Sequence, residues 1–146
     1  MNAHKIVDIL LEGEDEDFDA YFMAATSPKE AYALAQYSPE LRPGLERVIA
    51  TSAAYSYMYA RHVLKGQFPA GEPAIATNAG LSYEYARYCL KGKPFPLAEP
   101  AIAEDAMYSC MYAQHVLKGP FPAGEPAIAT DGDCVRDYNK RFGTNI

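Results

Sequence analysis

The 146-residue sequence contains no tryptophan, only three cysteines and no apolar run longer than a few residues. A helix that crosses a bilayer needs about 20 apolar residues, so we expect no membrane span. Charged side chains interrupt residues 1–11, which argues against a secretory leader. Cys89, Cys110 and Cys134 are odd in number and lack CxxC spacing, which favours a reduced, cytoplasmic protein over a disulfide-bonded one.

The motifs of metal, nucleotide and hydrolase sites are also missing. No CxxC or HxxxH pair offers zinc ligands, and no GxxxxGK[ST], GxGxxG or GxSxG pattern is present. His62 and His115 stand at equivalent places in a repeat, which is typical of a repeat surface and not of a general base. We therefore expect a protein that is not an enzyme, with no cofactor and no bound metal.

Basic residues are scarce at the front of the chain. Residues 1–46 hold ten of the 19 acidic residues but three of the 13 lysines and arginines. This balance argues against a generally basic nucleic-acid binder. The acidic residues cluster in one patch, where they either flank a solvated helix start or imitate a phosphate backbone: Glu12, Glu14, Asp15, Glu16, Asp17 and Asp19.

What the chain does contain is a repeat of 26 to 27 residues. The pentapeptide Glu-Pro-Ala-Ile-Ala at 72–76 recurs at 99–103 and 125–129, with a degenerate copy at 46–50. Each full copy is followed by Leu-Lys-Gly or its remnant, and three Phe-Pro pairs close the units at 68–69, 95–96 and 121–122. A fixed period of this size is the signature of stacked repeats that bury a continuous core together.

Each unit predicts two helices. Abundant alanine and few β-branched residues favour helices over strands. A proline opens a short helix, and a longer helix ends with lysine followed by glycine. Between them, five units place a side-chain oxygen at the same position, as expected of an N-cap: Ser27, Ser52, Asn78, Asp105 and Asp131.

The pattern predicts an all-α fold, a short α-solenoid of helical-hairpin repeats with an N-terminal capping helix, in a single domain of residues 1–146. The isoleucines of the Ile-Ala pairs should form one apolar ladder and the loop phenylalanines a second. The expected divisions are an N-terminal cap and acidic segment (1–24), a degenerate repeat (25–45), full repeats (46–71, 72–98 and 99–124) and a C-terminal capping repeat (125–146).

Tyrosine is unusually frequent in the predicted long helices. Many of these tyrosines are two positions apart, so they cannot all face inward on one helix. We expect about half of these tyrosines to be core residues and the rest to line a binding face with arginine, a composition enriched in protein-binding hot spots. The candidate partner-binding residues are Tyr59, Arg61, His62, Tyr85, Arg87, Tyr88, Tyr112, Gln114 and His115. Single-stranded nucleic acid is a less favoured ligand. It would bind along a basic stripe formed by Arg61, Lys65, Arg87, Lys91 and Lys118.

The tandem motifs Glu-Pro-x-Ile-Ala, Tyr-x-Tyr-Ala and Val-Leu-Lys-Gly-x-Phe-Pro, over residues 46–143, resemble repeats of uncharacterised bacteriophage and metagenomic proteins. The resemblance implies no assigned activity. It suggests a phage-encoded inhibitor or modulator that binds a host protein, such as a defence protein, in the host cell cytoplasm. The alternatives are a nucleic-acid-related role, through the acidic patch as a DNA mimic or through the basic stripe, and a structural unit that self-assembles as a homodimer.

Overall fold

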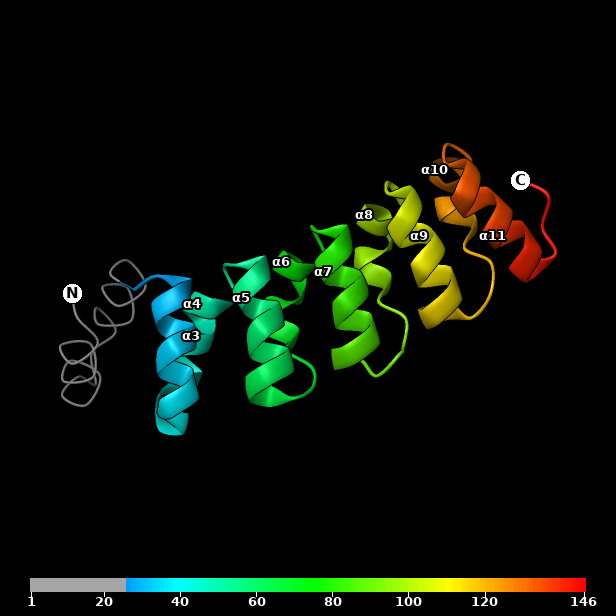
Figure 1. Cartoon of the computed structure of the whole chain (residues 1–146). Helices are drawn as coiled ribbons and strands as arrows, with labels where there is room; N and C mark the ends of the chain where they lie inside the picture. Colours follow the sequence, from blue (N-terminus) through cyan, green and yellow to red (C-terminus); the bar gives the residue numbers. More distant parts are fainter. Residues whose placement is uncertain (1–25) are drawn as a thin grey trace.

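The computed structural model describes residues 26–146. Helical pairs follow one another in a single row from the N-terminal to the C-terminal end of this region (Figure 1). Within the described residues there is no strand, so the predicted all-α repeat architecture is confirmed. The N-terminal capping helix and the acidic patch predicted for residues 1–24 lie outside this region.

Each repeat consists of a short helix, a longer helix and a 3-10 turn that leads to the next unit. The short helices are α4 (Arg42–Ile49), α6 (Glu72–Ile75), α8 (Glu99–Ala103) and α10 (Glu125–Ile128). The longer ones begin as α3 (Pro28–Tyr37), α5 (Ala53–Met58), α7 (Ala79–Glu84), α9 (Ala106–Tyr112) and α11 (Gly132–Phe142). The 3-10 turns are η1 (Pro39–Leu41), η3 (Pro69–Gly71), η5 (Pro96–Ala98) and η7 (Pro122–Gly124).

The predicted N-caps are present in all five units. Each cap residue has extended backbone, and its side-chain oxygen accepts a backbone N–H from the first turn of the helix. Asn78, for example, accepts from the amide of Leu81 at 2.9 Å. The cap therefore separates the short and long helices, and a continuous helix through residues 73–91 is excluded.

The core is built from the invariant apolar positions of the repeat. Ile49, Ile75, Ile102 and Ile128 are fully buried. Phe68, Phe95 and Phe121 are also buried, as predicted, and each ring lies about 5 Å from a buried tyrosine ring. Three buried serines add a bond that the sequence reading did not anticipate, because the Oγ of Ser56, Ser82 and Ser109 donates to the carbonyl of the isoleucine seven residues earlier.

A buried tyrosine bonds to a glutamate in each of the four long helices after α3, and three of these tyrosines also link their unit to the preceding one. The phenol of Tyr85 donates to Oε1 of Glu72 at 2.7 Å and accepts the backbone N–H of Phe68 at 2.9 Å. The same pair of bonds joins Tyr112 to Glu99 and Phe95. Tyr138 repeats it with Glu125 and Phe121, and Tyr59 makes the first bond with Glu46. This Tyr–Glu ladder satisfies polar groups that would be costly to bury alone.

Burial of the ladder makes stability sensitive to alkaline pH. Burial, reinforced by the neighbouring carboxylate, raises the pKa of Tyr138 to about 12, and burial raises the pKa values of Tyr59, Tyr85 and Tyr112. An unfolded tyrosine titrates near pH 10, so this contribution is complete below pH 10 and is lost as pH rises through the folded-state values. We expect the urea midpoint to fall between about pH 9 and about pH 11. A constant midpoint would contradict this arrangement.

The long helices do not continue as α-helices to their ends. Three of them widen into π-helical segments: η2 (Tyr59–Leu64), η4 (Tyr85–Cys89) and η6 (Ala113–Leu117). The predicted order of lysine followed by glycine is found at the end of each of these helices. Lys65, Lys91 and Lys118 adopt the left-handed conformation, with φ between 54° and 56°, and of the three glycines that follow only Gly92 also has positive φ.

A lysine in the left-handed region carries backbone strain that glycine avoids. Substituting Lys65→Gly should therefore raise the free energy of unfolding by about 0.5–1 kcal/mol, after the added unfolded-state entropy of glycine is counted. Lys93→Gly is the control, because Lys93 is not among the residues with positive φ. Urea denaturation checks the difference, and equal effects of the two substitutions would show that the strain is not real.

Candidate functional site

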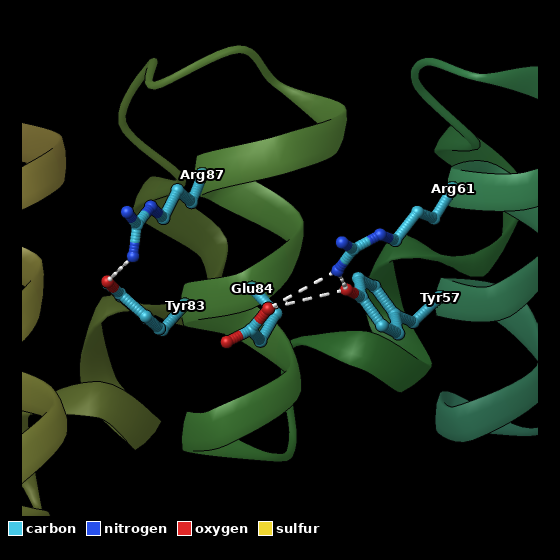
Figure 2. Close-up of polar contacts among 5 residues, drawn as sticks. All are labelled: Tyr57, Arg61, Tyr83, Glu84 and Arg87. Carbon is cyan, nitrogen blue, oxygen red and sulfur yellow. Dashed lines mark hydrogen bonds and ion pairs between the residues drawn. The ribbon is translucent and has the colours of Figure 1, made fainter.

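A row of polar and aromatic side chains lies along the long helices of successive units. We call it the ridge and define it by Tyr57, Arg61, Glu84, Arg87, Tyr88, Gln114 and His115. The fully buried Tyr83 supports it as a hydrogen-bond partner of Arg87 and His115. Its members come from α5 and η2, from α7 and η4, and from η6. Figure 2 shows Arg61 and Arg87 reaching from two neighbouring long helices in the same orientation.

Four of the five long helices position one donor by the same local contact. The Arg87 guanidinium donates to the phenol of Tyr83, four residues earlier, at 2.9 Å, and Arg61 donates to Tyr57 in the same way (Figure 2). In the flanking units the donor is an amide: Gln36 donates to Tyr32 at 3.0 Å and Gln114 to the Sγ of Cys110 at 3.2 Å. Residues four apart are neighbours on a helix surface, so this contact fixes the direction of every donor.

Two guanidiniums lie near the ring of Tyr88, one from the preceding unit and one from its own helix. The Arg61 guanidinium lies 4.1 Å from the centre of the Tyr88 ring, and that of Arg87 lies 5.3 Å from it. Glu84 braces this arrangement from the same helix as Tyr83, because its Oε2 lies 3.5 Å from Arg61 and accepts from Tyr57 at 3.4 Å (Figure 2). Tyr88 nevertheless keeps 44% of its surface exposed. The result is a prearranged, accessible ring with two guanidiniums within about 6 Å of its centre.

The next unit joins the ridge through a histidine. The phenol of Tyr83, which accepts from Arg87, lies 2.7 Å from Nδ1 of His115. We assign the phenol hydrogen to Nδ1, which leaves the ring hydrogen of His115 on Nε2. Burial and the positive charges of Arg87 and Arg141 lower the pKa of His115, so its ring is neutral at pH 7.

The ridge ends in a depression near the C-terminal end of the chain. Its volume is about 550 Å³, and it is lined by Arg87, Gln114, His115, Lys118, Arg141 and Phe142. A neighbouring depression of about 350 Å³ is lined by Gln114, Asp137, Lys140 and Arg141. Positive charge is therefore concentrated where the last three units meet.

Three of the nine predicted partner-binding residues are misplaced. Tyr59, Tyr85 and Tyr112 are fully buried and belong to the Tyr–Glu ladder, so they cannot line an exposed face. The prediction was wrong because it applied one α-helical period to the whole long helix. The change from α to π geometry near these tyrosines turns both Tyr83 and Tyr85 inward, although they are only two residues apart.

The other six lie at the surface. Arg61, Arg87, Tyr88, Gln114 and His115 are brought together in the ridge, and His62 is exposed beside it. The sequence reading did not connect Tyr57 or the buried Tyr83 with this surface, did not assign Arg141 and Phe142 of the adjoining depression, and placed Lys118 only in the nucleic-acid alternative. The i to i+4 spacing of tyrosine and arginine, repeated in two units, was the signal that could have found the first two.

Other kinds of site find no support among the described residues. In residues 26–146, no three His, Cys, Asp or Glu side chains gather in a group that could hold a metal ion. Over the same range, no helix combines the length and apolar character of a bilayer-crossing segment. Comparisons of the chain with family models, with curated proteins and with solved structures find no match.

Proposed function

We propose that this protein is a non-catalytic binding module that recognises a protein partner through the ridge. The observation that carries the proposal is the placement of Tyr88, which is 44% exposed and has the guanidiniums of Arg61 and Arg87 at 4.1 Å and 5.3 Å from its ring centre. Folding does not require it, because Tyr88 lies outside the core and its equivalents in other units are His62, His115 and Arg141. Tyrosine and arginine are the side chains most enriched in hot spots of protein interfaces.

Prearrangement of these side chains favours tight binding. The i to i+4 bonds and the bracing by Glu84 fix the rotamers of Arg61 and Arg87 before a partner arrives. Ordering a long side chain on binding costs about 0.5–1.5 kcal/mol, and this cost is reduced here. An exposed ion pair such as Arg61–Glu84 contributes little to stability, so its more important effect is to hold the binding surface in place.

The ridge suits a protein better than a single-stranded nucleic acid. Bases bind such surfaces by stacking on exposed aromatic faces, and the guanidiniums of Arg61 and Arg87 already lie over the ring of Tyr88. Glu84 also places a carboxylate within the ridge, where it would repel phosphates. In line with the resemblance of its repeats to phage proteins, the partner we propose is a host-cell protein that the chain inhibits or modulates.

The test is affinity capture from a host lysate, quantified by mass spectrometry, with the unmodified protein and with Arg61→Glu. A specific partner should be retained by the unmodified protein and lost with the charge-reversed variant. Arg136→Glu is the control, because Arg136 is exposed on α11, outside the ridge, and pairs only with Asp133 of its own helix. A captured protein that both variants retain equally would show that the ridge is not the binding surface.

Nucleic-acid binding is the second candidate, because the depression that ends the ridge is lined by Arg87, Lys118 and Arg141. A gel-shift experiment with single-stranded DNA and RNA at low salt distinguishes it from protein binding. If the ridge binds a protein, neither nucleic acid should show a gel shift. A shift that disappears as the salt concentration rises would favour the nucleic-acid role, because contacts to phosphates release counterions.

A further inference from the structure

The depression at the C-terminal end of the ridge is built from three successive units. Arg87 comes from η4, Gln114 and His115 come from η6, and Lys118 follows directly after η6. Arg141 and Phe142 come from the last turn of α11. Residues far apart in the sequence thus converge only because the units stack.

The lining carries three permanent positive charges, on Arg87, Lys118 and Arg141, and no carboxylate. Asp137 lines the neighbouring depression but not this one. Glu84, the acid of the ridge, is directed toward Arg61 and Tyr57. The three cations therefore have no lining carboxylate to neutralise them.

Several N–H groups that could donate hydrogen bonds to a ligand also line the site. Arg87 uses one guanidinium nitrogen for Tyr83 and keeps its other N–H groups. His115 accepts at Nδ1 and therefore carries a hydrogen on Nε2. Gln114 adds an amide. The ring of Phe142 packs edge-on against Tyr138 at 5.0 Å, which fixes an aromatic wall beside these donors.

We propose that this depression binds a phosphate monoester carried on a phosphorylated side chain of the protein partner. Three cations match the charge of a phosphate dianion better than that of a single carboxylate, and guanidiniums pair with phosphate oxygens in two-pronged contacts. The volume of about 550 Å³ also admits the carbon atoms that carry the phosphate, for which Phe142 provides the wall. This inference rests on the proposed function and names the chemistry of the partner.

The probes are inorganic phosphate and a short alanine-based peptide that carries one phosphoserine, with its serine and glutamate counterparts. Binding is followed by calorimetry and by the imidazole NMR signals of His115. The phosphoserine peptide should bind at least 10-fold more tightly than the serine or glutamate peptide. Its contact should also raise the pKa of His115, because a nearby anion favours the imidazolium.

Arg141→Gln should weaken binding of the phosphoserine peptide about 10-fold, the size expected when one charge-assisted hydrogen-bond donor is lost. Arg136→Gln, on the same helix but outside the depression, should leave the affinity unchanged. Equal affinity for the serine and phosphoserine peptides, or no effect of Arg141→Gln, would overturn the inference. Tighter binding of inorganic phosphate than of the peptide would overturn the assignment to a phosphorylated partner.

The two proposals fail in different ways. The Arg61→Glu variant tests binding through the ridge alone, because Arg61 does not line the depression. In one case the Arg61→Glu variant still captures the partner, and the phosphoserine peptide binds with an affinity that depends on Arg141. The ridge proposal then fails, and the phosphate site stands. If Arg61→Glu loses the partner while the peptide does not bind, only the inference of this subsection fails.

Discussion

Replacing Tyr85 with phenylalanine is expected to lower the free energy of unfolding by about 1–3 kcal/mol, because a buried amide and a half-buried carboxylate lose their hydrogen bond at once. The backbone N–H of Phe68 would have no acceptor, and Oε1 of Glu72 would lose its donor. The ring itself is conserved, so packing against Phe95 at 5.1 Å is retained. The change in stability therefore measures the bond and not the volume of the side chain.

Tyr37→Phe is the matched control, since the Tyr37 side chain is 84% exposed. Its effect on the free energy of unfolding, measured by urea denaturation, should be within about 0.5 kcal/mol of zero. Amide hydrogen exchange adds a local readout, because the amide of Phe68 should exchange faster in Tyr85→Phe. Equal stability of the two variants would mean that the Tyr–Glu ladder contributes nothing to folding.

Replacing Tyr88 with alanine is expected to weaken binding of the partner by about 2 kcal/mol or more, roughly 30-fold. The substitution removes the ring that both Arg61 and Arg87 contact, so the two guanidiniums lose their shared support. Stability should change little, because Tyr88 is exposed and lies outside the core. A titration calorimetry or surface-binding experiment with the captured partner measures the change.

Two further variants sharpen this result. Tyr88→Phe keeps the ring and should retain most of the affinity, which distinguishes a cation–aromatic contact from a hydrogen bond of the phenol. Leu97→Ala removes another exposed side chain, 56% accessible and away from the ridge, and should have no effect. Equal losses for Tyr88→Ala and Leu97→Ala would contradict a specific role for Tyr88.

The sequence was sufficient to predict the features that depend on local spacing. Ser27, Ser52, Asn78, Asp105 and Asp131 could be identified as caps because a cap depends on residue type and position alone. The isoleucine and phenylalanine ladders could be predicted for a similar reason, since each unit repeats the same apolar positions. The period of 26 to 27 residues then specified an all-helical stack.

A single helical period could not show which tyrosines face the core and which face the solvent. Tyr83 and Tyr85 both become buried because the helix widens at Tyr85, and nothing in the composition marks that change. A usable clue was present in the spacing of 13 residues between glutamate and tyrosine in four units: Glu46 and Tyr59, Glu72 and Tyr85, Glu99 and Tyr112, and Glu125 and Tyr138. The glutamates were interpreted only as part of the repeated pattern.

The contacts of the ridge depend on how neighbouring units are placed. Arg61 reaches Tyr88 across 27 positions, and Arg141 shares a depression with Arg87 across 54. Such contacts require the rotation between units, which spacing within one unit does not contain. The ridge lies at positions that differ among the five units, whereas the cap and isoleucine positions keep the same kind of residue.

The most direct test compares partner capture by Tyr88→Ala and Tyr85→Phe in the same lysate, at a temperature where both variants are folded. The account predicts that Tyr88→Ala loses the partner and keeps the stability of the unmodified protein. Tyr85→Phe should show the reverse, with lower stability and normal capture. Capture of the partner by Tyr88→Ala with undiminished affinity would contradict the claim that the ridge binds protein.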